Sequence, residues 1–116
     1  MDSKTQKTPA TYKVKITKQA LLNIDEITGY IAFINHQPLN AIKVGDAIFS
    51  KINRIGKRPF AFKECEELPT KSKMYRKAVC YSWHIVYRVS NIDVVILGLL
   101  HTSRKPSRIK ALRKIK

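Results

Sequence analysis

A chain of 116 residues can bury one hydrophobic core and is too short for two domains. Its hydrophobic fraction of 44% is ordinary for a globular protein, whereas its net charge of +15 favours nucleic acid, an anionic surface or an acidic protein as partner. No apolar run approaches the roughly 20 residues that span a membrane, so we expect a cytoplasmic protein with no membrane partner.

The basic charge is concentrated in the second half of the chain. Residues 68–116 contain twelve Lys or Arg and a single acidic residue, Asp93. Cys65 and Cys80 match no metal-ligand spacing, so we expect reduced thiols, with Cys80 in the core. Residues 1–11 are polar and lack an apolar signal core, and we expect them to form a disordered lead.

The first predicted element is a strand over residues 12–16. Tyr12, Val14 and Ile16 alternate with lysines, which predicts one buried and one exposed face. Exposed lysines are typical of an edge strand, because their charge discourages pairing with another chain. Thr17 follows at the position of a helix N-cap.

Two amphipathic helices are predicted next. The first has an apolar face that recurs every three or four residues: Ala20, Ile24, Ile27, Ile31 and Ile34. The second begins at Pro38, ends at Gly56 and Pro59, and repeats the pattern with Ala41, Val44, Ile48, Ile52 and Ile55. Because the connection is short, we expect an antiparallel hairpin whose joint apolar face covers a sheet.

An antiparallel meander of three strands is predicted over residues 74–100. The pattern is rich in Val, Ile and Tyr and is interrupted by turns at Tyr81–Ser82 and Ser90–Asn91. The last strand, Val94–Leu100, is apolar on both faces and needs cover on both. The predicted fold is therefore α+β: an N-terminal strand and an antiparallel two-helix hairpin packed on a C-terminal antiparallel β-meander, with four strands in the sheet.

Two segments show no clear periodic spacing of apolar residues. We expect residues 59–72 to form a loop that two phenylalanines hold to the core. Residues 107–116 are a basic tail in which Ile109, Leu112 and Ile115 are spaced by three, so a short amphipathic helix is one alternative. We expect a mobile tail, because its positive charges repel one another. The predicted single domain then covers residues 12–106.

No metal or catalytic motif stands out. His36, His84 and His101 do not have the spacing of a metal site, and the glycines are scattered rather than gathered in a phosphate-binding loop. We therefore expect no metal and no cofactor. What remains as a source of function is basic and aromatic.

The strand over residues 83–89 places such residues on one face. Alternate residues beginning at Trp83 are predicted to enter the core, and His84, Val86 and Arg88 then face the other way. Either Arg76 or Lys77 shares this second face, depending on the hairpin register. A concave basic face could hold RNA phosphates, with histidine as acid or base. The alternative is that its charges only solvate the sheet.

The order of these elements resembles the RelE/ParE superfamily of type II toxins. Residues 30–60 are similar to the ParE pattern of a tyrosine-bearing helix, a Pro-Ala junction and a terminal proline. Tyr75-Arg76-Lys77 and Trp83–Val89 follow in the expected order. The last strand ends in a histidine, two residues, an arginine and a proline, as in ParE proteins, and the similarity covers residues 12–106.

This resemblance implies a small toxin that an antitoxin wraps and masks in a hetero-oligomer. RelE-like members cleave messenger RNA in the ribosome through basic and aromatic side chains, whereas ParE-like members poison DNA gyrase and have no accepted nuclease site. If the chain is RelE-like, the resemblance implies catalytic roles for Arg76, His84 and Arg104. His84 stands where an arginine is common in that branch.

The hairpin and the ending of the last strand favour the ParE branch. The resemblance then implies that this chain inhibits DNA gyrase and is neutralised by an acidic antitoxin. A RelE-like endoribonuclease acting on ribosome and messenger RNA is one alternative, and a non-toxic nucleic-acid-binding module is another. The residues expected to bind the target or the antitoxin are basic: Arg76, Lys77, Arg88, His101, Arg104, Lys105 and Arg108.

Overall fold

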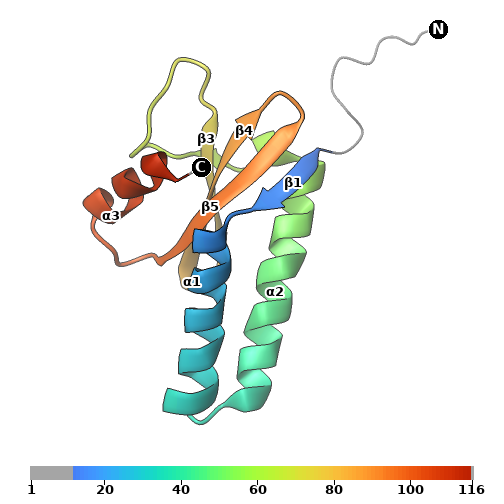
Figure 1. The fold of residues 1–116 in the computed structure, drawn as a ribbon, viewed down its shortest axis with the longest axis vertical. Coiled ribbons are helices and arrows are strands. Elements are labelled where there is room, and N and C mark those ends of the chain that lie inside the picture. Colours follow the sequence, from blue (N-terminus) through green and yellow to red (C-terminus); the bar gives the residue numbers. More distant parts are fainter. Residues whose placement is uncertain (1–11, 116) are drawn as a thin grey trace, which may run out of the picture.

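The computed structural model describes residues 12–115, and the lead expected over residues 1–11 lies outside them. Five strands form one sheet in the order β1-β5-β4-β3-β2 (Figure 1). The strands are β1 Lys13–Ile16, β2 Lys63–Glu64, β3 Tyr75–Cys80, β4 Trp83–Ser90 and β5 Asp93–His101. The helical elements are α1 Lys18–Gly29, the π-helical turn η2 Tyr30–Ile34, α2 Pro38–Lys57, the 3-10 turn η3 Pro59–Ala61, α3 Pro106–Lys110 and the 3-10 turn η4 Ala111–Lys114.

The predicted α+β class and the meander are confirmed. β3, β4 and β5 pair antiparallel in sequence order, and β1 lies parallel to β5 at the edge of the sheet. The predicted number of four strands is wrong, because Lys63 and Glu64 pair with β3 and add a fifth. This strand has only two residues, so the sequence has too few positions to display an alternating pattern.

Thr17 joins the start of α1 to the sheet. Its Oγ1 accepts a hydrogen bond from the Ala20 N–H at 3.1 Å, which is the predicted N-cap, and donates to the Ile96 carbonyl at 2.8 Å. One side chain therefore both caps the helix and fixes its position on β5. At the same open end of the hairpin, the buried Tyr87 hydroxyl donates to the Pro59 carbonyl just after α2.

The helical hairpin covers one face of the sheet, as predicted. The isoleucines of its two stripes, including Ile24, Ile31, Ile48 and Ile55, are buried with residues of β4 and β5. Ile34 is the exception and is exposed. Because the π-helical turn η2 inserts an extra residue per turn, it rotates Ile34 away from the stripe that the three-or-four spacing predicts.

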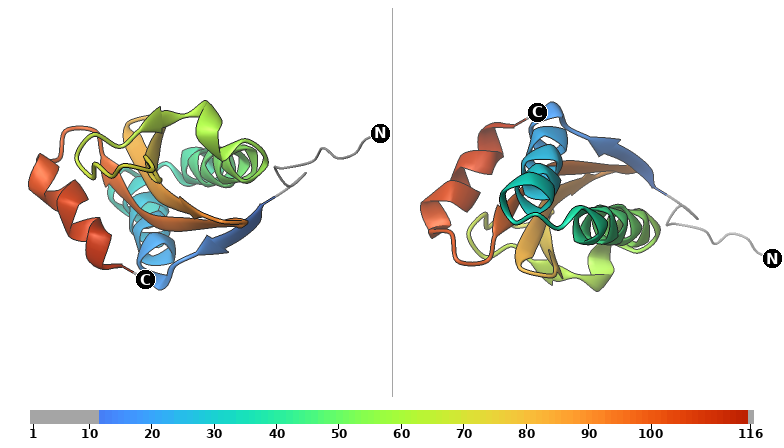
Figure 2. Two further views of the ribbon diagram at one scale, coloured as in Figure 1. Left: turned by 90° about the horizontal axis from the view of Figure 1, so that it is seen from above. Right: turned by 90° about the horizontal axis from the view of Figure 1, so that it is seen from below.

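The opposite face of the sheet is covered by the C-terminal segment. Ile109 of α3 and Leu112 of η4 are buried there with Val86, Val95 and Leu97. Figure 2 shows α3 on the side of the molecule away from α2. The expectation of a mobile tail is therefore wrong for residues 107–115, because burial of its apolar positions outweighs the repulsion among its charges. Among the described residues, no helix is both long and apolar enough to cross a membrane.

Candidate functional site: a basic groove

A groove of about 870 Å³ opens between α1 and the segment that links β5 to α3. Helix α1 contributes one wall, the ends of β4 and β5 form the floor, and residues 103–108 form the other wall. The lining residues that carry polar or aromatic groups are Asn23, Glu26, Tyr30, Trp83, His101, Ser103, Arg104, Lys105, Ser107 and Arg108. The volume is within the range of pockets that hold a small ligand.

The turn after β5 gives the groove its shape. The Arg104 N–H donates to the His101 carbonyl at 2.9 Å, and the Thr102 N–H donates to the Ser82 carbonyl at 2.8 Å. Pro106 then begins α3, where its fixed φ suits the first helical position. The chain therefore leaves the sheet at a fixed point, and the basic residues 104–108 are held beside α1.

Trp83 and His101 form the aromatic end of the groove. They are opposite each other in the β4–β5 register, with ring centroids 6.0 Å apart in an edge-to-face arrangement. The Ser103 N–H donates to Nδ1 of His101 at 3.1 Å, and Ser103 Oγ lies 2.8 Å from the same nitrogen. Because Nδ1 accepts the backbone N–H, the neutral ring carries its proton on Nε2.

The groove is strongly basic. Arg104, Lys105 and Arg108 line it, and Glu26 is the one acidic residue among the lining residues. Within residues 12–115, none of these three cations forms an ion pair. A groove of this kind attracts an acidic segment, and the rings of Trp83 and Tyr30 supply apolar surface beside the charges.

A second polar cluster lies on the sheet face that the C-terminal segment covers. Lys77 Nζ is 3.0 Å from Glu67 Oε1, and both side chains are largely buried, with 12% and 20% exposed. The Cys65 thiol lies 3.5 Å from the same oxygen. Nδ1 of His84 is buried and has no hydrogen-bond partner among the described residues.

Burial and the neighbouring charges shift the pKa values of this cluster. Burial of Glu67 opposes its ionisation, but hydrogen bonds from Lys77 and the backbone outweigh that effect and lower the pKa of the carboxyl. Burial, and then the Glu67 carboxylate, raise the pKa of the Cys65 thiol to about 11. Burial, reinforced by the charge of Lys77, lowers the pKa of His84. The cluster therefore holds a neutral imidazole and an unreactive thiol.

The seven basic residues predicted for target or antitoxin binding do not form one surface. His101, Arg104, Lys105 and Arg108 line the groove together. Lys77 belongs to the covered cluster, and Arg88 lines a smaller pocket with Lys15, Thr17 and Asp93. Arg76 lies on the hairpin side of the sheet, where its guanidinium donates to the carbonyls of Phe62 and Lys73, both at 3.0 Å.

The β3–β4 register determines which basic residue of β3 shares a sheet face with His84. Lys77 is opposite Val86 and Arg76 is opposite Tyr87, so Lys77 is on the side of His84 and Arg76 is on the other side. The expectation of an open concave basic face is wrong, because Val86 at its centre is fully buried under the C-terminal segment.

The groove residues that sequence reasoning missed include Glu26, Tyr30 and Trp83. The strand alternation predicts Trp83 in the core, and its side chain does pack against the core, but it also lines the groove. Glu26 of α1 and Tyr30 of η2 are four residues apart in sequence, next to the buried stripe, and this second helical face is the signal that could have found them. Within the described part of the chain, no group of three or more His, Cys, Asp or Glu is placed to hold a metal ion.

The sequence and the structure were also compared with those of known proteins. The sequence profile described as "ParE toxin of type II toxin-antitoxin system, parDE" matches residues 14–106. A structure of the chromosomal ParDE system from P. aeruginosa gives a TM-score of 0.62 at 18% identity, covering 80% of this chain and 98% of that one. The toxin–antitoxin complex RelBE2 from Mycobacterium tuberculosis gives 0.53 at 17%, covering 83% and 94%. No curated protein sequence matches.

Proposed function

The chain belongs to the ParE toxin family of type II toxin–antitoxin systems, and on that basis we propose that it arrests growth by binding and inhibiting DNA gyrase in the cytoplasm. An acidic antitoxin neutralises it by occupying the basic groove. Inhibition on this proposal is a protein–protein contact, so it needs no acid, base or nucleophile. His101, Arg104, Lys105 and Arg108 are the contact residues we assign to it.

The observation that carries the choice of gyrase is the separation of the three residues that a RelE-like nuclease would use. Arg76 and His84 are on opposite faces of the sheet, and Arg104 lines the groove without either of them. General acid–base catalysis requires groups within hydrogen-bond reach of one phosphate. This arrangement favours the branch of the superfamily that acts without a nuclease site.

The groove supports the antitoxin part of the proposal. Its three cations are not paired with carboxylates within the described residues, so an acidic segment would supply the missing counter-charges. Tyr30 and Trp83 offer ring faces to apolar side chains of the same segment. Association should be fast and sensitive to salt, because a +15 protein steers an acidic partner over a long range.

The test is a supercoiling assay with purified gyrase and relaxed plasmid. We expect the wild-type protein to inhibit supercoiling and the double variant Arg104→Gln/Arg108→Gln to require roughly tenfold more protein, since two rim charges contribute ~0.5–1 kcal/mol each. Lys43→Gln is the matched control, because it removes a cation from α2, away from the groove, and should leave inhibition unchanged.

A second assay with translated messenger RNA separates the two branches. Cleavage by the wild-type protein that is lost in His84→Ala, together with unaffected gyrase, would reject the proposal in favour of a ribosome-dependent nuclease. Inhibition that disappears when unrelated competitor DNA is added would instead indicate binding to nucleic acid through charge alone.

A further inference from the structure

The closing turn of the helical hairpin carries the most exposed large apolar side chains of the described residues. Leu39 is 81% exposed, Phe33 77%, Ile42 62% and Ile34 61%. All four lie between residues 33 and 42, and we call them the hairpin patch. Single exposed apolar residues are normal, but four of the largest at one turn form a surface that needs an explanation.

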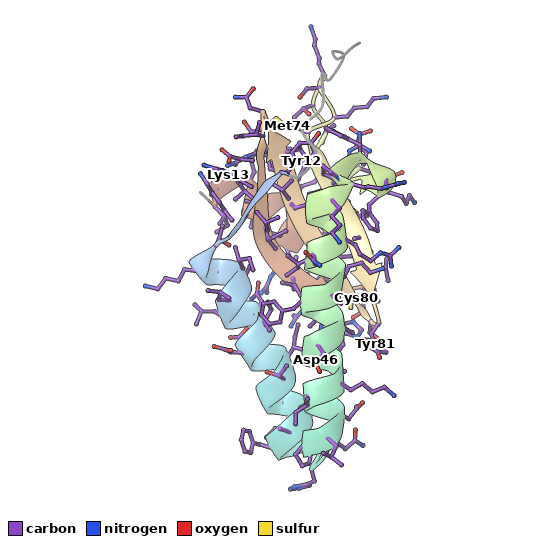
Figure 3. The ribbon with its side chains drawn as sticks, turned by 90° about the vertical axis from the view of Figure 1, so that its right-hand side faces the viewer. Tyr12, Lys13, Asp46, Met74, Cys80 and Tyr81 are labelled. Carbon is purple, nitrogen blue, oxygen red and sulfur yellow. The ribbon has the colours of Figure 1, made fainter. Side chains whose placement is uncertain are left out.

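The hairpin patch is exposed because the hairpin extends past the sheet. Figures 1 and 3 show the two helices continuing along the longest axis, 56 Å in extent, beyond the end of the strands. In Figure 3, Asp46 of α2 lies near the level of Tyr81, which marks the β3–β4 turn, and the hairpin turn lies farther out. The sheet therefore offers no surface to cover Phe33 or Leu39.

The same end of the molecule differs in charge from the rest. Residues 27–42, which form the turn and include all four patch residues, contain no Asp, Glu, Lys or Arg, so all 23 Lys and Arg lie elsewhere in the sequence. With histidine counted as neutral, the segment has no net charge. In a protein of net charge +15, this is a region where a second positively charged body meets no net repulsion.

We propose that the hairpin patch is the contact between two copies of this chain, joined hairpin turn to hairpin turn about a two-fold axis. An isologous contact brings apolar residues onto their own counterparts, so one patch suffices for both partners. It also places the two basic bodies at opposite ends of the pair. Their separation then exceeds the Debye length of about 8 Å at physiological salt, so their mutual repulsion is largely screened.

A partner of other chemistry fits this surface less well. An acidic antitoxin segment is attracted to the groove and gains nothing electrostatically from an uncharged turn. Docking of the patch on the basic body of another copy would be heterologous and would not close into a dimer. The pairing of identical turns is the arrangement that satisfies both the apolar surface and the charge.

The patch also predicts a weak, reversible dimer. Four side chains around one turn bury less than the roughly 1,200 Å² in total that stable complexes need. The groove and the hairpin patch are formed by different residues, so the dimer leaves the groove open to its partner. Dimerisation and the proposed inhibition of gyrase therefore fail independently of each other.

Sedimentation equilibrium of the purified full chain, without antitoxin, tests the proposal over a dilution series. We expect the mass to rise from 13.3 kDa towards twice that value as concentration increases. Leu39→Asp should weaken the association constant by about tenfold or more, because it removes an apolar contact and opposes two negative charges. The variant should fold, since α2 has no acid in its first turn and an Asp there favours the helix dipole.

Ile92→Asp is the matched control, because Ile92 is a half-exposed apolar residue on the β4–β5 turn, outside the hairpin. It should dimerise like the wild type. Added salt should change a turn-to-turn dimer little, because its basic bodies already lie farther apart than the Debye length, whereas it would strengthen docking of the patch on a second basic body, where the like charges are close together. A wild-type protein that stays monomeric throughout, or a Leu39→Asp variant that dimerises normally, overturns the proposal. So does a monomer whose Leu39→Asp variant loses antitoxin binding, because the patch would then belong to the antitoxin.

Discussion

Leu112 lies directly over Gly98: a Cβ at position 98 would be 2.9 Å from Cδ2 of Leu112 and 3.1 Å from Oδ1 of Asn23. Asn23 cannot retreat freely, because its Oδ1 accepts the Leu99 N–H at 3.0 Å. The absence of a side chain at Gly98 therefore allows both α1 and η4 to approach β5. This contact holds the C-terminal segment, and with it one wall of the groove.

Gly98→Ala should consequently lower the free energy of unfolding by ~1–3 kcal/mol, because the added methyl overpacks the site. Gly29→Ala is its control, since a Cβ at position 29 meets no atom within 4 Å and Ala favours a helix over Gly by up to ~1 kcal/mol. Urea denaturation of both variants is the measurement. Equal stability of the two would show that Leu112 yields easily and does not press on the sheet.

The Lys77–Glu67 pair should show measurable coupling. Because both side chains are largely buried, the pair is less screened than one at the surface, and Lys77 Nζ lies within 3.3 Å of both carboxylate oxygens. A double-mutant cycle with Glu67→Gln and Lys77→Met should give a coupling free energy of ~1 kcal/mol in chemical denaturation. The exposed pair Lys15–Asp93, at 3.6 Å, is the comparison and should give less. Coupling near zero at the first pair would mean that its desolvation cancels its attraction.

His84 makes the stability of the fold sensitive to mild acid. Its pKa is lowered in the folded protein, so the unfolded chain binds the proton more readily. The contribution is therefore complete above 6.5, the ordinary value, and is lost as the pH falls through the lower folded pKa. The charged groups that influence it are Lys77, Glu67 and Lys63. The pKa of Glu67 is also lowered, and its contribution is lost in a separate window below 4.5.

His84→Gln should flatten the decline in unfolding free energy as the pH falls below 6.5, since the titrating group is gone. His36→Gln, at an exposed position in the hairpin turn, should keep the wild-type profile. The measurement is the free energy of unfolding of the wild type and both variants, taken from denaturation curves at several pH values in this range. An unchanged slope in His84→Gln would assign the acid sensitivity to another group.

Much of the fold follows from the spacing of apolar residues. The periods that contain Ile24 and Ile48 predict the hairpin correctly, and the alternation around Tyr87 predicts the meander. Spacing fails where backbone geometry changes locally, as at Ile34 in the π-helical turn, or where an element is too short to have a period, as in β2. Spacing also does not predict that Leu112 is buried. The benefit of burying this side chain depends on a sheet face that the local sequence does not reveal.

The candidate site was less predictable than the fold. The sequence predicts His101, Arg104, Lys105 and Arg108 as candidates because they lie close together at and after the end of one strand. The contribution of Trp83 depends on its register opposite His101, and that of Glu26 depends on where α1 lies on the sheet. Both are tertiary facts that no local pattern contains. The register also separates Arg76 from His84, a point on which the choice of function depends.

Arg76 should act as a structural anchor. Besides its hydrogen bonds to the Phe62 and Lys73 carbonyls, its guanidinium lies 4.9 Å from the centroid of the Phe60 ring. Arg76→Ala should therefore reduce the free energy of unfolding by ~1–3 kcal/mol, because two carbonyls lose a charged donor and the ring loses its cation. Arg54→Ala, which removes an exposed cation of α2, is the control and should change stability little.

Denaturation gives the stability, and growth arrest at low temperature, where both variants are folded, gives the activity. We expect Arg76→Ala to remain toxic under those conditions. A stable but inactive Arg76→Ala would reverse this assignment and return Arg76 to the functional surface.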